Sequence, residues 1–182
     1  MSTQATQRGG IEVGVILEVI WARPEVRIGC LLAVFTAVAV ARARSRSGRP
    51  WVGPAGLTAV VGTVLTVTLF DARGAEGGPG ILDQCRLGGL TATASELMTW
   101  SGLANVILFV PVGLFAAMTA PRARGAFLMG TGLSLLIEVT QGALGTRDCS
   151  SVDLVANTVG VALGVTTVLA TRKARSATRP SR

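Results

Sequence analysis

Two series of polar or small residues in the second half of the chain repeat with the period of an α-helix. The first runs at i, i+3, i+7 and i+10 and comprises Thr131, Ser134, Glu138 and Gln141. The second runs at i, i+4, i+7 and i+11 and comprises Asp153, Asn157, Gly160 and Gly164. Each series therefore lies on one face of its helix. Because the surrounding residues are apolar, these faces indicate contacts between helices, or a site.

Glu138 makes the strongest case for chemistry, because it is the one charged residue of the apolar stretch 126–145. An ionised side chain at the centre of a membrane helix costs about 2.5–3.5 kcal/mol on insertion scales, so an acid there is a candidate for a site. Glu138 could donate or accept a proton. Arg147 and Asp148 follow it in a short loop, where the arginine could pair with Glu138 or hold a phosphate group.

A purely structural role is the alternative for several of these residues. Intramembrane Asn and Gln side chains often only bond across helices, for about 0.6 kcal/mol each. This alternative stays open for Asn105, Gln141 and Asn157. An aspartate at the start of a helix, such as Asp153, is often an N-cap, which is compatible with a function.

Several classes of site are excluded or disfavoured by composition. The chain has no His, which excludes histidine general bases, histidine metal ligands and Ser-His-Asp triads. No set of metal ligands is complete, so we expect neither a metal nor a cofactor. The net charge of +7 comes from short basic clusters beside apolar runs, without interleaved aromatic residues. This distribution argues against nucleic acid as a partner and favours a lipid bilayer.

The elements that must position these residues are membrane-spanning helices, each of which needs about 20 predominantly apolar residues. Five segments meet or approach that length: 28–41, 51–70, 101–120, 126–145 and 153–170. The sequence therefore predicts an all-α, polytopic transmembrane helix bundle of about five spans. The apolar stretch 11–21 is short and contains Glu12 and Glu18, so it predicts an N-terminal interfacial helix, with a sixth span as the alternative.

Charge in the connecting segments predicts the orientation. Basic residues without acidic neighbours fill three stretches, 42–49, 122–124 and 172–182. The positive-inside rule makes all three cytoplasmic, with an outside N-terminus and a cytoplasmic C-terminus in the cell membrane. The loops 71–100 and 146–152 then lie outside. The polar residues expected near the outer leaflet are Asn105, Glu138, Gln141, Arg147, Asp148, Asp153 and Asn157.

The expected organisation is an N-terminal segment 1–27, a transmembrane domain 28–171 and a basic cytoplasmic tail 172–182. Cys85 and Cys149 fall in the two outer loops. Because the outer face is oxidising, we expect a disulfide between them, with two free thiols as the alternative. Cys30 lies within a span and is interpreted as an apolar filler.

Three stretches resemble the VanZ-like family of bacterial integral membrane proteins. They are Asn105-Val-Ile-Leu-Phe-Val-Pro-Val-Gly113, Ser134-Leu-Leu-Ile-Glu138-Val-Thr-Gln141, and Arg147 followed by Asp153-Leu-Val-Ala-Asn157-Thr-Val-Gly160. The resemblance covers about residues 85–165. The acidic pair that the family often has before its last span is reduced here to Val152-Asp153.

The resemblance implies an envelope protein, because the founding member is linked to lowered sensitivity to teicoplanin, a lipoglycopeptide that acts outside the cell. The expected partners are a lipid-linked envelope precursor or a lipoglycopeptide. A non-enzymatic role is favoured. The alternatives are an intramembrane enzyme that acts on an envelope lipid, and a small transporter or flippase that uses Glu138. The oligomeric state is not predicted.

Overall fold

A computed structural model describes residues 23–70, 85–86, 95, 97–144 and 149–178. Its long helices are α2 (Pro24–Arg46), α3 (Val52–Phe70), α5 (Trp100–Thr119), α6 (Ala123–Leu144) and α7 (Ser151–Ala177). Two strands of two residues each, β1 (Cys85–Arg86) and β2 (Cys149–Ser150), pair in parallel. The predicted interfacial helix at 11–21 lies outside the described residues.

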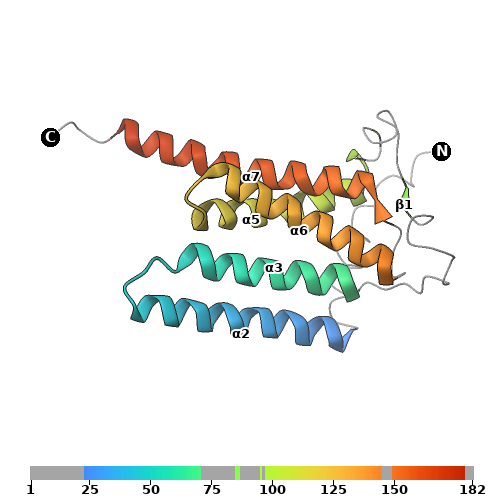
Figure 1. Cartoon of the computed structure of the whole chain (residues 1–182), viewed down its shortest axis with the longest axis horizontal. Coiled ribbons are helices and arrows are strands. Elements are labelled where there is room, and N and C mark those ends of the chain that lie inside the picture. Colours follow the sequence, from blue (N-terminus) through green and yellow to red (C-terminus); the bar gives the residue numbers. More distant parts are fainter. Residues whose placement is uncertain (1–22, 71–84, 87–94, 96, 145–148, 179–182) are drawn as a thin grey trace, which may run out of the picture.

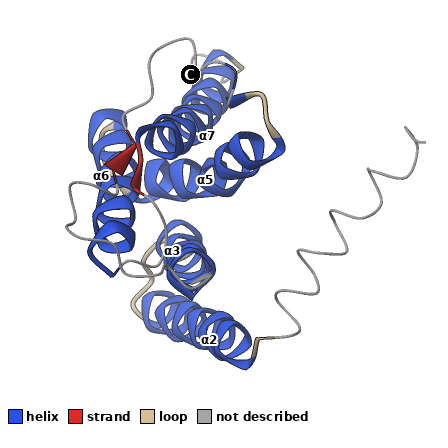
Figure 2. Cartoon of the chain, turned by 90° about the vertical axis from the view of Figure 1, so that its right-hand side faces the viewer, coloured by secondary structure: helices blue, strands red, loops and turns tan. Residues whose placement is uncertain are grey.

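All five helices are long and apolar enough to cross a membrane. This finding confirms the predicted all-α bundle with five spans among the described residues. The helices run side by side and alternate in direction (Figure 1). Seen from the end that carries the strands, α5, α6 and α7 group together, α3 lies next to them, and α2 lies outermost (Figure 2). The protein is therefore a multi-pass membrane protein in which α5, α6 and α7, called the central helices below, pack as one group.

Glycines bring α5 and α7 into direct backbone contact. A Cβ atom added to Gly160 would collide with the carbonyl oxygen of Val106, and one added to Gly164 would collide with that of Val110. A Cβ atom added to Gly113 on α5 would likewise collide with the carbonyl oxygen of Val161 on α7. Small residues at such an interface let helices approach closely in a membrane. The face that carries Gly160 and Gly164 thus makes a contact between helices, as its spacing indicates.

Two helices are longer than their apolar stretches. Helix α2 begins at Pro24 and ends at Arg46, whereas hydropathy predicted 28–41. Proline suits the first turn of a helix, because the missing N–H would have no partner there. Helix α7 continues to Ala177 instead of ending near 170. Arginine and lysine are good helix formers whose heads reach the interface, so hydropathy misses these last turns.

The two ends of the bundle differ in charge. The end where α2, α5 and α7 finish lies on the left of Figure 1 and carries the three basic stretches. No Asp or Glu occurs in 42–50, 119–125 or 154–182. The opposite end carries β1, β2 and the first turns of α5 and α7. The positive-inside rule predicts that the basic end is cytoplasmic.

Candidate functional site

Glu138 ties the end of α6 to the start of α7. Its side chain is only 4% exposed. The carboxylate oxygen Oε2 accepts a hydrogen bond of 2.9 Å from the backbone N–H of Ser150, the residue that precedes α7. The buried acid therefore links α6 to the residue that precedes α7.

Ser150 also caps α7. Its hydroxyl oxygen accepts hydrogen bonds from the backbone N–H groups of Val152 and Asp153, at 3.2 and 3.4 Å. Such a cap satisfies N–H groups that have no partner inside the helix. The cap is thus Ser150 and not Asp153, which its place near the start of the helix suggested for that role. The motif Ser150-x-x-Asp153 is the signal that could have identified it.

Asp153 lies in the first turn of α7 and bonds to α5. Its Oδ1 atom accepts a hydrogen bond of 2.8 Å from the amide Nδ2 of Asn105. An acid in the first turn is also favoured by the positive end of the helix dipole. Both side chains are partly exposed, unlike Glu138. Asn105 and Asp153 are therefore the members of the group that a ligand could touch without displacing a helix.

Asn157 lies one turn deeper on α7. Its Nδ2 atom donates a hydrogen bond of 2.9 Å to the hydroxyl of Ser134 on α6, and both side chains are buried. Among the described residues, the Oδ1 atom of Asn157 and the hydroxyl of Thr131 are buried polar atoms that have no partner. A buried polar atom without a hydrogen-bond partner costs about 1–3 kcal/mol of stability. These two atoms therefore mark a part of the interior where hydrogen bonds are missing.

Gln141 joins α6 to α3. Its Nε2 atom donates a hydrogen bond of 2.8 Å to the backbone carbonyl of Thr68, in the last turn of α3, and its side chain is 3% exposed. Sequence reasoning missed Thr68, because a backbone acceptor leaves no signal in residue type. This bond extends the polar end of the bundle to a fourth helix.

The structure thus brings together five of the seven predicted residues. Three hydrogen bonds connect α5, α6, α7 and the turn before α7, and a fourth reaches α3. We call these residues the polar cluster: Asn105, Ser134, Glu138, Gln141, Ser150, Asp153 and Asn157. The other two predicted residues, Arg147 and Asp148, lie outside the described residues. The cluster lies toward the end of the bundle opposite the basic one (Figure 1).

The two outer cysteines are brought together at the level of the backbone. Strands β1 and β2 pair in parallel with Cys85 opposite Cys149. Ser150 is the next residue of β2 and is the one bonded to Glu138. A link at Cys149 would therefore lie directly beside the residue that Glu138 bonds. The disulfide between the two cysteines stays a prediction.

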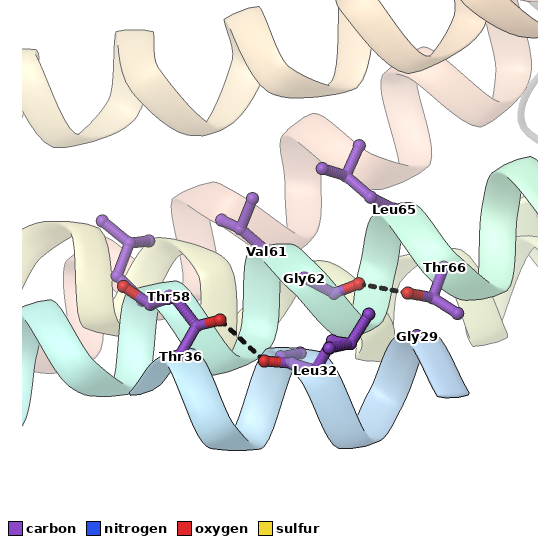
Figure 3. A pocket seen from close by; sticks show the side chains of 10 residues that line it. Gly29, Leu32, Thr36, Thr58, Val61, Gly62, Leu65 and Thr66 are labelled. Carbon is purple, nitrogen blue, oxygen red and sulfur yellow. Dashed lines mark hydrogen bonds between the residues drawn. The ribbon is translucent and has the colours of Figure 1, made fainter. Parts of the chain in front are cut away.

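A pocket of about 640 Å³ between α2 and α3 has a different character. Its lining is almost entirely apolar and includes Gly29, Ala33 and Leu65 (Figure 3). Its threonine hydroxyls donate to carbonyl groups of their own helices, as Thr66 does to Gly62 at 2.7 Å. Because these hydroxyls are already bonded within their helices, the pocket has the chemistry of a surface that faces lipid.

Comparison with known proteins places the second half of the chain in a family. A family model described as VanZ/LLP1 matches residues 82–172. No curated protein and no solved structure gives a match. The matched region contains β1, β2, α5, α6 and nearly all of α7, which together hold every residue of the polar cluster. The chain is a membrane protein that belongs to the VanZ/LLP1 family.

Proposed function

We propose that the polar cluster faces the outside of the cell and binds the polar part of a lipid-linked envelope precursor. By occupying or shielding that precursor, the protein would lower sensitivity to teicoplanin-type glycopeptides. A lipoglycopeptide itself is the other ligand that this chemistry suits. The expectation comes from the resemblance to the VanZ-like family and from the basic opposite end of the bundle, which the positive-inside rule makes cytoplasmic.

One observation carries the proposal: buried and half-buried polar side chains of three central helices gather at a single end. Glu138, Gln141 and Asn157 are each less than 5% exposed, in helices whose membrane-spanning parts are otherwise mostly apolar. Polar groups are expensive inside a membrane, and those that persist there commonly mark a site. The polar cluster also includes an unpartnered buried oxygen, on Asn157, among the described residues.

The geometry divides the cluster into two roles. Asn105 and Asp153 are partly exposed, and a carboxylate next to an amide can accept and donate hydrogen bonds to the amide and hydroxyl groups of a peptide or sugar. Arg147 is predicted to lie beside them and to hold a phosphate group. Glu138 is bonded to the backbone that starts α7, so its role is to position Asp153 and the loop.

This division favours a binding protein over an enzyme. A general acid or base must reach the reacting group within hydrogen-bond distance. Glu138 is buried, and its Oε2 atom accepts a hydrogen bond from the N–H of Ser150, so a substrate would have to displace that bond to reach this oxygen. Asp153 could be reached more easily, but the sequence places no second acid next to it.

The test is to measure how much fluorescently labelled teicoplanin binds to cells that produce the protein or its variants. Wild-type protein should lower the bound label relative to cells without it. Asp153→Asn and Asn105→Ala should restore binding while the amount of protein in the membrane stays normal. Thr140→Val is the matched control, because the Thr140 hydroxyl donates only to Leu136 on its own helix.

Two outcomes contradict the proposal. If wild-type protein leaves the bound label unchanged, the link to glycopeptides is wrong. If Asp153→Asn and Asn105→Ala keep the full effect of the wild type at equal membrane levels, the polar cluster is structural and does not form the site.

We also propose the disulfide between Cys85 and Cys149. A bond between Cys85 and Cys149 would fix β1 to the strand that carries Ser150. We expect the protein, purified from the cell membrane without a reducing agent, to lack free thiols at these two positions. Mass spectrometry of alkylated peptides, with and without prior reduction, measures this directly, and alkylation of both cysteines without reduction contradicts it.

A further inference from the structure

A second pocket lies at the basic end of the bundle, away from the polar cluster. It has a volume of about 360 Å³ and lies between the ends of α5 and α7. Its lining combines apolar, hydroxyl and basic side chains, from Leu114, Met118, Thr167, Val168, Thr171, Arg172 and Arg175. The apolar residues precede the arginines along α7, so the wall changes from apolar to basic as the helix leaves the membrane.

One of the two arginines is fixed in place. The Nη2 atom of Arg172 donates a hydrogen bond of 2.8 Å to the backbone carbonyl of Ala117, near the end of α5. The last carbonyl groups of a helix have no partner within it, so this bond satisfies one of them. A guanidinium has five N–H donors. The bond therefore orients the group and leaves most of its donors for a ligand.

The charge of this pocket is not neutralised by the two helices that form it. No acidic residue occurs in 100–119 or in 154–182. Arg172 and Arg175 are one turn apart on α7 and both are exposed at the pocket. Two adjacent guanidinium groups without a carboxylate are a suitable arrangement for an oxyanion such as a phosphate.

We propose that this pocket binds an anionic glycerophospholipid. The phosphate group lies against Arg172 and Arg175, and the upper part of an acyl chain lies along Leu114, Met118 and Val168. Basic residues at the end of a membrane helix attract anionic lipids, and basic pockets between helices hold their headgroups. The volume is at the small end of the range for ligand sites, which fits a headgroup and the start of a chain. This inference does not depend on the function proposed for the polar cluster.

The test is a titration of delipidated full-length protein in detergent, followed by native mass spectrometry. Phosphatidylglycerol should bind, and zwitterionic phosphatidylcholine should not. Arg175→Gln should weaken the binding of phosphatidylglycerol about fivefold, the effect expected for one basic residue near a membrane surface. Arg172→Lys keeps the charge but loses the planar guanidinium group, which can donate two parallel hydrogen bonds to a phosphate. It should therefore weaken binding less than Arg172→Gln.

Two further variants distinguish binding in the pocket from non-specific attraction between basic residues and an anionic lipid. Thr167→Phe leaves the charge unchanged and fills the pocket, so it should abolish specific binding. Arg124→Gln removes one exposed basic residue at the same end that does not line the pocket, so it should bind like the wild type. Because Arg175 has no role in the bond to Ala117, its variant should fold even if Arg172→Gln does not.

The proposal is overturned if phosphatidylcholine binds as well as phosphatidylglycerol. It is also overturned if Arg124→Gln weakens binding as much as Arg175→Gln, since charge alone would then explain the result. Displacement of the lipid by millimolar inorganic phosphate would show that the arginines take a free anion, and that outcome contradicts a lipid site as well.

Discussion

The N-terminal pair of helices and the three central helices are built from similar apolar residues, but they are held together differently. In the pair, α2 packs mainly against α3, and the threonine hydroxyls of both helices donate to their own backbones. In the central group, side chains of α5, α6 and α7 bond across helices and backbones touch at glycines. Hydrophobicity alone does not drive helices together in lipid, so hydrogen bonds across helices and backbone contacts specify the geometry of the central group, whereas Gly29 and Gly62 of the pair meet side chains of the facing helix.

The difference shows where a function can reside. A site needs side chains held in fixed positions by their neighbours, and the central helices provide that for Asp153 and Asn105. The family match covers this central region and does not extend to α2 and α3. We therefore expect the N-terminal pair to act as a scaffold and the proposed site to lie in the second half of the chain.

The largest loss of stability is expected when a glycine between α5 and α7 is replaced by alanine. In Gly164→Ala the new Cβ would meet the backbone of α5 at Val110 and Leu114, which cannot yield. We expect a loss of about 3 kcal/mol in the free energy of unfolding, the upper part of the range for overpacking. Unfolding in mixed detergent micelles, followed by circular dichroism, measures this change.

Gly132→Ala is the matched control, because nothing lies within 4 Å of its added Cβ atom. It should leave stability unchanged or raise it by a few tenths of a kcal/mol, since alanine favours the helix. Equal effects of the two substitutions would show that α5 and α7 are not in backbone contact.

The second prediction concerns the bond between Glu138 and Ser150. Glu138→Ala removes the acceptor and leaves the backbone N–H of the partly buried Ser150 without this partner, at a cost of about 1–2 kcal/mol. Glu138→Gln keeps a carbonyl oxygen that can accept the same bond, so it should recover most of that loss. Thermal unfolding of the purified variants compares them. Equal losses for both would mean that the charge matters and the hydrogen bond does not.

The smallest effect is expected in the N-terminal pair. Thr58→Val removes a hydroxyl that donates only to Pro54 on its own helix, at 2.9 Å. The change in stability should be below about 0.5 kcal/mol. Under the same conditions, Ser134→Ala in the central group should cost about 1 kcal/mol, because Asn157 loses its partner on another helix. A larger loss for Thr58→Val than for Ser134→Ala would reverse the comparison between the two regions.

Much of the fold follows from the sequence, because hydropathy and helical period are local properties. The five spans and the shared faces of Glu138 with Gln141 and of Asp153 with Asn157 were predictable from spacing. The helix ends at Arg46 and Ala177 were not, because charged residues can prolong a helix beyond its apolar stretch.

The contacts within the polar cluster could not be predicted in the same way. Which partner Asn105 or Gln141 finds depends on the rotation and depth of neighbouring helices, and spacing along one helix does not determine these. Gln141 donates to the backbone carbonyl of Thr68, and the type of a residue does not predict whether its carbonyl accepts such a bond. The cap at Ser150 was readable from its motif, but its bond to Glu138 was not, because that bond depends on tertiary structure.

The central claim is that the polar end of α5 and α7 faces the outside of the cell and is open to water there. Its most direct test uses a variant without native cysteines that carries Asn105→Cys, treated in intact cells with a membrane-impermeant maleimide. We predict labelling from outside at this position, and labelling of Ser176→Cys, at the basic end, only after the cells are permeabilised. Labelling of Ser176→Cys from outside, with Asn105→Cys unreactive until permeabilisation, would contradict the account.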